Sequence, residues 1–81
     1  MQLKEAIVLR FQELCRHKNI KNNELATISG VTPSTIYSMM DSRRKDLSVI
    51  TVKKLCDGLN ISVKEFFDDD LFADELEYEI K

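Results

Sequence analysis

The thiol and imidazole chemistry of this 81-residue sequence is confined to Cys15, Cys56 and His17. Two cysteines so far apart make neither a disulfide framework nor a metal cluster, and each falls among the apolar positions of an expected helix. We therefore expect buried, reduced thiols. The lone histidine cannot build a metal or catalytic site, and the sequence has no Ser/His/Asp set or phosphate-binding glycine loop. We expect no enzyme, no metal and no cofactor.

The sequence is rich in charged residues, and positive and negative residues are unevenly distributed along it. Residues 1–54 contain ten Lys and Arg against five Asp and Glu, whereas residues 55–81 contain two against nine. The two parts carry +5 and −7, which sum to the formal net charge of −2. Because a polyanion responds to the local field and not to the total, the basic part can still bind one.

The basic part contains a stretch, residues 22–37, that predicts two short helices folded about Gly30. Gly30 can take the positive φ that ends the first helix sharply, and we expect any side chain there to be strained and to crowd the two helices. Thr32 can cap the second helix, and Pro33 suits its first turn. Ala26 is small enough for the helices to approach closely. This is the arrangement of a helix-turn-helix, whose second helix enters the major groove of DNA.

The helix-turn-helix has to be held by further helices. Asn19 and Asn60 are expected to end two of them, and Ser62 with Glu65 makes a capping box. Apolar residues at helical spacing predict five helices without repeats or linkers, over about 3–17, 22–29, 33–41, 48–60 and 62–67.

Three separate segments carry a resemblance to a known family, namely residues 20–26 (IKNNELA), 30–32 (GVT) and 59–62 (LNIS). In these segments and their separations the chain closely resembles the Cro/repressor type of helix-turn-helix, the XRE family of bacterial and phage regulators. The resemblance covers roughly residues 9–67. It implies an all-α, compact, five-helix, lambda-repressor-like domain over residues 1–67, followed by an acidic tail, residues 68–81.

The resemblance also implies which residues touch DNA. It implies that the residues at the start of the third helix contact base edges, namely Pro33, Ser34, Tyr37 and Ser38. None of these is the Gln or Arg that reads a base with two hydrogen bonds, so we expect weak discrimination through hydrogen bonds and more reliance on shape and apolar contact.

Phosphate contacts are implied on both sides of the reading helix. The residues implied to contact phosphates are Asn22, Asn23, Thr32, Arg43, Arg44 and Lys45. Lys21 stands where the family commonly has the serine that caps the second helix. Cys15 and Met40 stand where the family often has a partly buried Arg–Glu pair, and their joint exchange avoids an uncompensated buried charge. We expect the first and third helices still to dock through apolar contacts.

The acidic tail lies outside the resemblance and leaves three alternatives open. Phe72, Leu76 and Ile80 are spaced i, i+4, i+8, which allows a last helical segment that packs on the core or on a second subunit. The tail could instead be disordered, or its acids could compete with DNA for the basic face.

Two functions follow from these observations. The first is a sequence-specific DNA-binding transcriptional regulator, expected to be a repressor that binds double-stranded DNA as a homodimer with half-sites about 34 Å apart. The alternative is a protein-interaction helix-turn-helix, such as an antitoxin or the partner of a phage-derived regulator. No apolar run is long enough to span a membrane and no signal-peptide layout is present, so we expect a cytoplasmic protein without a small-molecule ligand.

Overall fold

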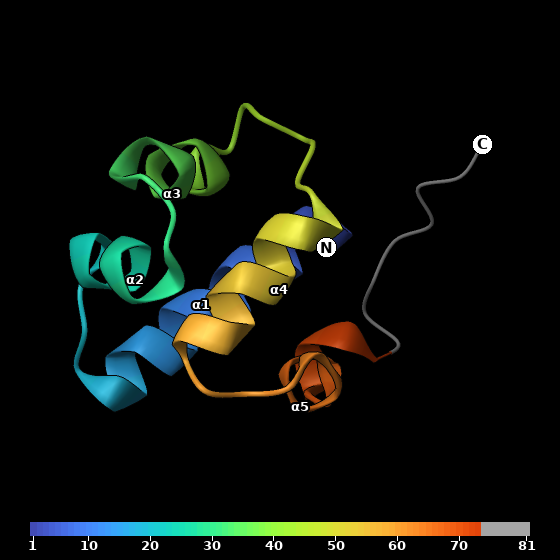
Figure 1. The fold of residues 1–81 in the computed structure, drawn as a ribbon. Coiled ribbons are helices and arrows are strands. Elements are labelled where there is room, and N and C mark those ends of the chain that lie inside the picture. The colour runs from blue at the N-terminus through green and yellow to red at the C-terminus, as the bar shows by residue number, and fades with distance from the viewer. Residues whose placement is uncertain (74–81) are drawn as a thin grey trace.

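Five α-helices follow one another along the chain: α1 (Leu3–Lys18), α2 (Asn22–Ser29), α3 (Pro33–Met40), α4 (Val49–Gly58) and α5 (Val63–Phe67). A 3₁₀ turn, η1 (Asp70–Phe72), comes after them. Helices α1 and α4 occupy the middle of the molecule, with α2 and α3 at one end and α5 at the other (Figure 1). The computed structural model describes residues 1–73, so the expected helical positions Leu76 and Ile80 lie outside the described residues. The predicted all-α five-helix class is confirmed.

The helix ends are fixed by local chemistry that the sequence predicts. Asn19 and Asn60 both adopt the left-handed conformation, with φ of 56° and 57°, which the short polar side chain of asparagine tolerates. Ser48 accepts a hydrogen bond from the Ile50 N–H at 3.1 Å, and Ser62 accepts one from the Glu65 N–H at 3.0 Å. Helix α3 ends one residue earlier than expected, at Met40.

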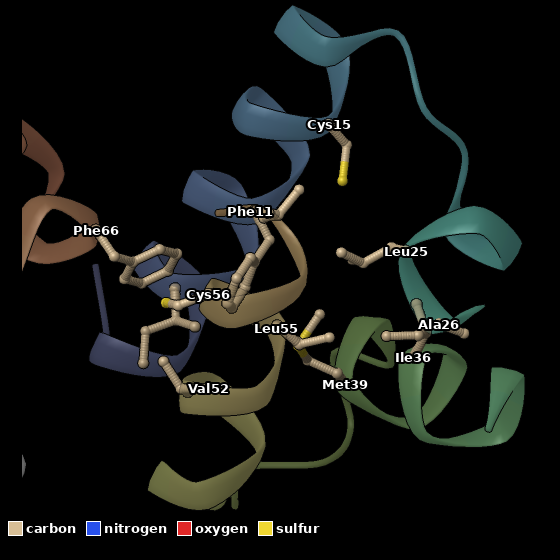
Figure 2. Packing of buried hydrophobic residues seen from close by; sticks show 12 residues of the cluster. Phe11, Cys15, Leu25, Ala26, Ile36, Met39, Val52, Leu55, Cys56 and Phe66 are labelled. Atoms are coloured by element: carbon tan, nitrogen blue, oxygen red, sulfur yellow. The ribbon is translucent and has the colours of Figure 1, made fainter. Parts of the chain in front are cut away.

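One apolar cluster joins all five helices (Figure 2). The largest fully buried side chains of this cluster are Phe11, Phe66, Leu25, Ile36, Leu55, Leu59 and Cys56. Cys15 and Cys56 are both buried and free, and burial raises the pKa of each thiol. The expectation of two buried, reduced thiols is therefore confirmed. None of the helices in residues 1–73 combines the length and apolar character needed to cross a membrane.

Helices α2 and α4 approach closely at Gly58, near the end of α4. A Cβ there would lie 2.3 Å from Ser29 Oγ and 2.9 Å from Ser29 Cα on α2. Since such distances are too short for real side chains, α2 and α4 can pack this closely only with glycine at position 58.

The end of the molecule formed by α5 and η1 is joined to α1 by an aromatic cluster that contains all four phenylalanines of the chain. The ring of Phe66 lies 4.4 Å from that of Phe11, 5.0 Å from Phe67 and 5.8 Å from Phe72, measured between centroids. Phe72 belongs to the acidic tail, so the first part of this tail packs on the core. Of the three alternatives, core packing holds for this part.

Arg10 of α1 completes the same junction. Its guanidinium donates from Nε to the Phe66 carbonyl at 2.8 Å and from Nη2 to the Glu65 carbonyl at 3.1 Å. It also forms ion pairs with Glu13 at 3.2 Å and with Asp69 at 3.3 Å, while only 11% of its side chain is exposed. Asp69, an acid of the tail, therefore neutralises Arg10 on α1.

Candidate nucleic-acid interface

The turn between α2 and α3 has the geometry that the sequence predicts. Gly30 has φ of +70°, and its N–H donates to the Thr27 carbonyl at 3.3 Å while the Val31 N–H donates to the Ala26 carbonyl at 3.1 Å. The expected crowding is wrong, because a Cβ on Gly30 would meet no atom within 4 Å. Only the left-handed backbone conformation selects glycine here.

Helix α3 starts as predicted and has a buried inner face and a more exposed outer face. Thr32 Oγ1 accepts a hydrogen bond from the Thr35 N–H at 3.4 Å, and Pro33 occupies the first position of the helix. Ile36 and Met39 point into the core, with 0% and 3% of their surfaces exposed. The outer face presents three exposed residues and one half-buried residue, which are Pro33, Ser34, Tyr37 and Ser38. All four side chains proposed to read bases therefore lie together on one face.

A hydrogen bond connects this outer face to the start of α2. The Tyr37 hydroxyl donates to Asn23 Oδ1 at 3.4 Å, although 56% of Tyr37 remains exposed. A residue proposed to read bases thus orients a residue proposed to bind phosphate. The neighbouring Asn22 is half-buried at the first position of α2.

The N-terminus of α2 is capped differently from the family pattern. Lys21 is the N-cap residue and supplies no side-chain cap. The Glu24 carboxylate instead accepts a hydrogen bond from the Lys21 N–H at 3.4 Å. The Lys21 side chain is exposed, and its charge is available to an approaching polyanion.

A shallow hollow of about 290 Å³ lies between α3 and the start of α4, and we call it the α3–α4 hollow. Its polar lining includes Ser34 and Ser38 from α3 and Arg44 from the connecting loop. Ser48, the N-cap of α4, and Thr51 of α4 also contribute to it, and neither is among the site residues that the sequence predicts. Asp46 belongs to the same lining, and its carboxylate would repel a phosphate.

The loop of residues 41–46 carries less free positive charge than its three cations indicate. Asp41 accepts hydrogen bonds from Arg43 Nε at 3.1 Å and from Arg43 Nη2 at 3.0 Å, as well as from the Arg43 backbone N–H at 3.0 Å. These bonds hold the pKa of Asp41 at about 2. Arg43 is therefore ion-paired with Asp41, although 88% of its side chain stays exposed. This carboxylate, two positions earlier, was not weighed in the prediction from the sequence.

Arg44 and Lys45 differ from Arg43, since neither makes an ion pair with another residue in the range 1–73. Both are exposed. These two residues, rather than all three, form the available basic element beside α3.

The exchanged pair at Cys15 and Met40 is compatible with close helix packing. Cys15 is 6% exposed, and Met40 is partly buried against the core. Gln12 Nε2 approaches Met40 Sδ at 3.7 Å, which joins α1 to α3. Within the part of the chain that the structure describes, no three His, Cys, Asp or Glu side chains group closely enough to hold a metal ion.

A family model described as a Cro/C1-type HTH DNA-binding domain matches residues 10–70. The chain is 30% identical over 56 residues to the SPbeta prophage-derived uncharacterized HTH-type transcriptional regulator YopS of Bacillus subtilis (strain 168), a match that covers 69% of this chain and 76% of that protein.

The fold is also similar to that of a solved prophage protein. The crystal structure of the prophage Lp1 protein 11 superposes with a TM-score of 0.81 at 32% identity, over 90% of this chain and 97% of that one. The family match spans most of the sequence and includes every helix except the start of α1. The chain therefore belongs to the Cro/C1-type helix-turn-helix family of DNA-binding domains.

Proposed function

We propose that this protein is a transcriptional repressor that occupies a promoter with α3 in the major groove. The observation that carries the proposal is the position of Ser34, Tyr37 and Ser38 on one outward face beside Arg44, which makes no ion pair within residues 1–73. A recognition helix needs such a face for base edges and a nearby cation for phosphate. The prophage origin of both relatives supports a phage-derived regulator that acts on cytoplasmic DNA.

The roles divide between the two kinds of contact. Pro33, Ser34, Tyr37 and Ser38 meet base edges, with hydroxyls that accept or donate and a tyrosine ring that can pack on a thymine methyl group. Phosphate contacts fall to Asn22, Asn23 and Thr32 on one side and to Arg44 and Lys45 on the other, while Arg43 contributes less because Asp41 already binds it.

The proposed active form is a homodimer. A single domain of this size covers one half-site, so a dimer on a near-palindrome, with half-sites about 34 Å apart, gives useful affinity. Sedimentation of the protein with and without a bound DNA site measures this directly.

Selection of bound fragments from random DNA tests the proposal. We expect enrichment of a near-palindromic site, and we expect Tyr37→Ala to change the enriched sequence. Thr27→Ala is a matched control on the exposed surface of α2 and should leave the sequence unchanged. Failure to enrich any site would overturn the proposal and favour a protein-interaction helix-turn-helix.

A further inference from the structure

A second hollow, which shares Arg44 with the α3–α4 hollow, lies between the first half of α1 and the loop that follows α3. We call it the α1 hollow. Its volume is about 180 Å³, and its apolar lining is made by Val8, Leu9 and Met40, which we call the floor. Leu9 is 41% exposed although it is a large apolar residue. A floor of this kind favours an occupant with apolar side chains.

Part of the lining of the α1 hollow is cationic, and we call this part the rim. Lys4, Arg44 and Lys45 line it, and Glu5 is the acid on the same lining. Lys4 Nζ donates to the Asp41 carbonyl at 2.8 Å, which fixes the loop against α1. An occupant that combines apolar side chains with carboxylates would match both the floor and the rim.

Residues 74–81 of the same chain have this composition. Leu76, Tyr78 and Ile80 alternate with glutamates, and the segment contains four acids against one lysine. The segment therefore complements the hollow in both charge and apolar character.

The place where the described chain ends puts this segment within reach. Asp69, Asp70 and Leu71 share a hollow with Met1, and the next residue, Gln2, lines the α1 hollow. Arg10 and the phenylalanine cluster hold this part of the chain in place. A chain of eight residues can reach at most roughly 26–29 Å. This reach is long compared with the step from Met1, beside Leu71, to Gln2, which lines the α1 hollow.

We propose that residues 74–81 dock in the α1 hollow of their own chain, with Leu76 and Ile80 on the apolar floor and the glutamates against Lys4, Arg44 and Lys45. Because Arg44 and Lys45 are also the proposed phosphate contacts, docking competes with DNA. This second consequence rests on the proposed function, whereas docking itself does not. The alternative apolar surface at Val49 and Ile50 is more exposed, at 79% and 69%, but neither residue lines the α1 hollow with its cationic rim.

Docking is tested first without DNA, by a spin label on a Lys81→Cys variant of the full chain. Labelling is selective because Cys15 and Cys56 are buried, and their thiol pKa values are raised. We expect the label to broaden the amide signals of Val8, Leu9 and Met40 but not that of Ile28 on α2. The double variant Leu76→Ser, Ile80→Ser should abolish the broadening while keeping the charge of the segment.

Two results would overturn the proposal. One is unbroadened signals at Val8 and Leu9 in the labelled chain. The other is broadening that appears only when labelled protein is mixed with unlabelled, isotope-enriched protein, because the segment would then occupy a second copy.

The competition with DNA is tested with the same double variant. A tethered segment has an effective concentration in the millimolar range, so release of a weakly docked segment should tighten DNA binding by about 2–10-fold at low salt. The Ile50→Ser variant serves as a control, and its DNA affinity should show no such gain. If the double variant binds DNA with unchanged affinity while the parent chain shows the broadening, docking is retained and the competition with DNA is refuted. Absence of DNA binding in every variant would refute the proposed function and leave the docking result standing.

Discussion

The two ends of this molecule are built in opposite ways. At the end formed by α5 and η1, the aromatic cluster is closed and Arg10 is surrounded by two carbonyls and two carboxylates. At the end formed by α2 and α3, hydroxyls remain on an exposed face and Arg44 has no carboxylate partner in the range 1–73. Arg10 and the phenylalanine rings are satisfied internally at the first end, whereas Arg44 and the exposed hydroxyls at the second end remain accessible to a ligand. We therefore propose that the first end carries stability and that the second carries recognition.

The largest expected effect is on stability at the closed end. Phe66→Ala removes the ring that contacts three other phenylalanines, and it should lower the free energy of unfolding by about 3–5 kcal/mol. Urea denaturation followed by circular dichroism measures the loss. A change below about 1 kcal/mol would mean that this end does not carry the stability assigned to it.

Arg10→Ala should have the next largest effect. It removes the Arg10 donors to the Phe66 and Glu65 carbonyls, of which the Glu65 carbonyl keeps the Asp68 N–H, and it breaks two ion pairs. We expect this to cost about 2–3 kcal/mol. Arg16→Ala is the matched control on the same helix, because Arg16 is exposed and should change stability by about 0.5 kcal/mol or less. Equal effects of the two substitutions would show that Arg10 contributes only through its charge.

Substitution by alanine and by asparagine should affect stability differently at Gly58 and at Gly30. Gly58→Ala brings a Cβ against Ser29 and should cost about 1–3 kcal/mol, whereas Gly30→Ala has free space and should cost about 1–2 kcal/mol through backbone conformation alone. Asparagine separates the causes, since it tolerates the left-handed region. Gly30→Asn should be milder than Gly30→Ala, and Gly58→Asn should be worse than Gly58→Ala. The reverse order in thermal unfolding would contradict this assignment.

These glycines also show how far sequence reasoning reaches. Gly30, Asn19, Ser48 and Ser62 could be identified because helix caps and turns depend on the residue and its immediate neighbours. Gly58 could not, since the reason for it is the backbone of Ser29 on another helix. The family resemblance, the fold class and the helix order were all predictable from local pattern and spacing.

The candidate site was predictable in part. The positions of Ser34 and Tyr37 on one face follow from helical spacing after Pro33. The ion pair between Arg43 and Asp41 and the approach of Thr51 to Ser38 depend on how the loop folds. Counting cations along the sequence therefore overestimated the free charge of this loop.

The smallest expected effect concerns Asp41 and pH. Its folded pKa is about 2, below the ordinary value of 3.8. A carboxylate with a lowered pKa contributes stability above its unfolded value, and the contribution is lost as the pH falls through the folded value. NMR titration should place the Asp41 pKa near 2 in the parent, and Arg43→Ala should return it toward 3.8. An unchanged titration in the variant would show that Arg43 is not the cause.

The most direct test of the division between the two ends compares Arg44→Gln with Lys64→Gln. Both remove one positive charge, the first beside α3 and the second from the exposed surface of α5. We measure the affinity for the selected DNA site as a function of salt. Arg44→Gln should weaken binding and reduce the slope of log K against log salt by about 0.9, the value for one lost phosphate contact, whereas Lys64→Gln should leave the slope unchanged. Equal loss of slope in both variants would contradict the account, because DNA would then respond to net charge and not to a defined interface.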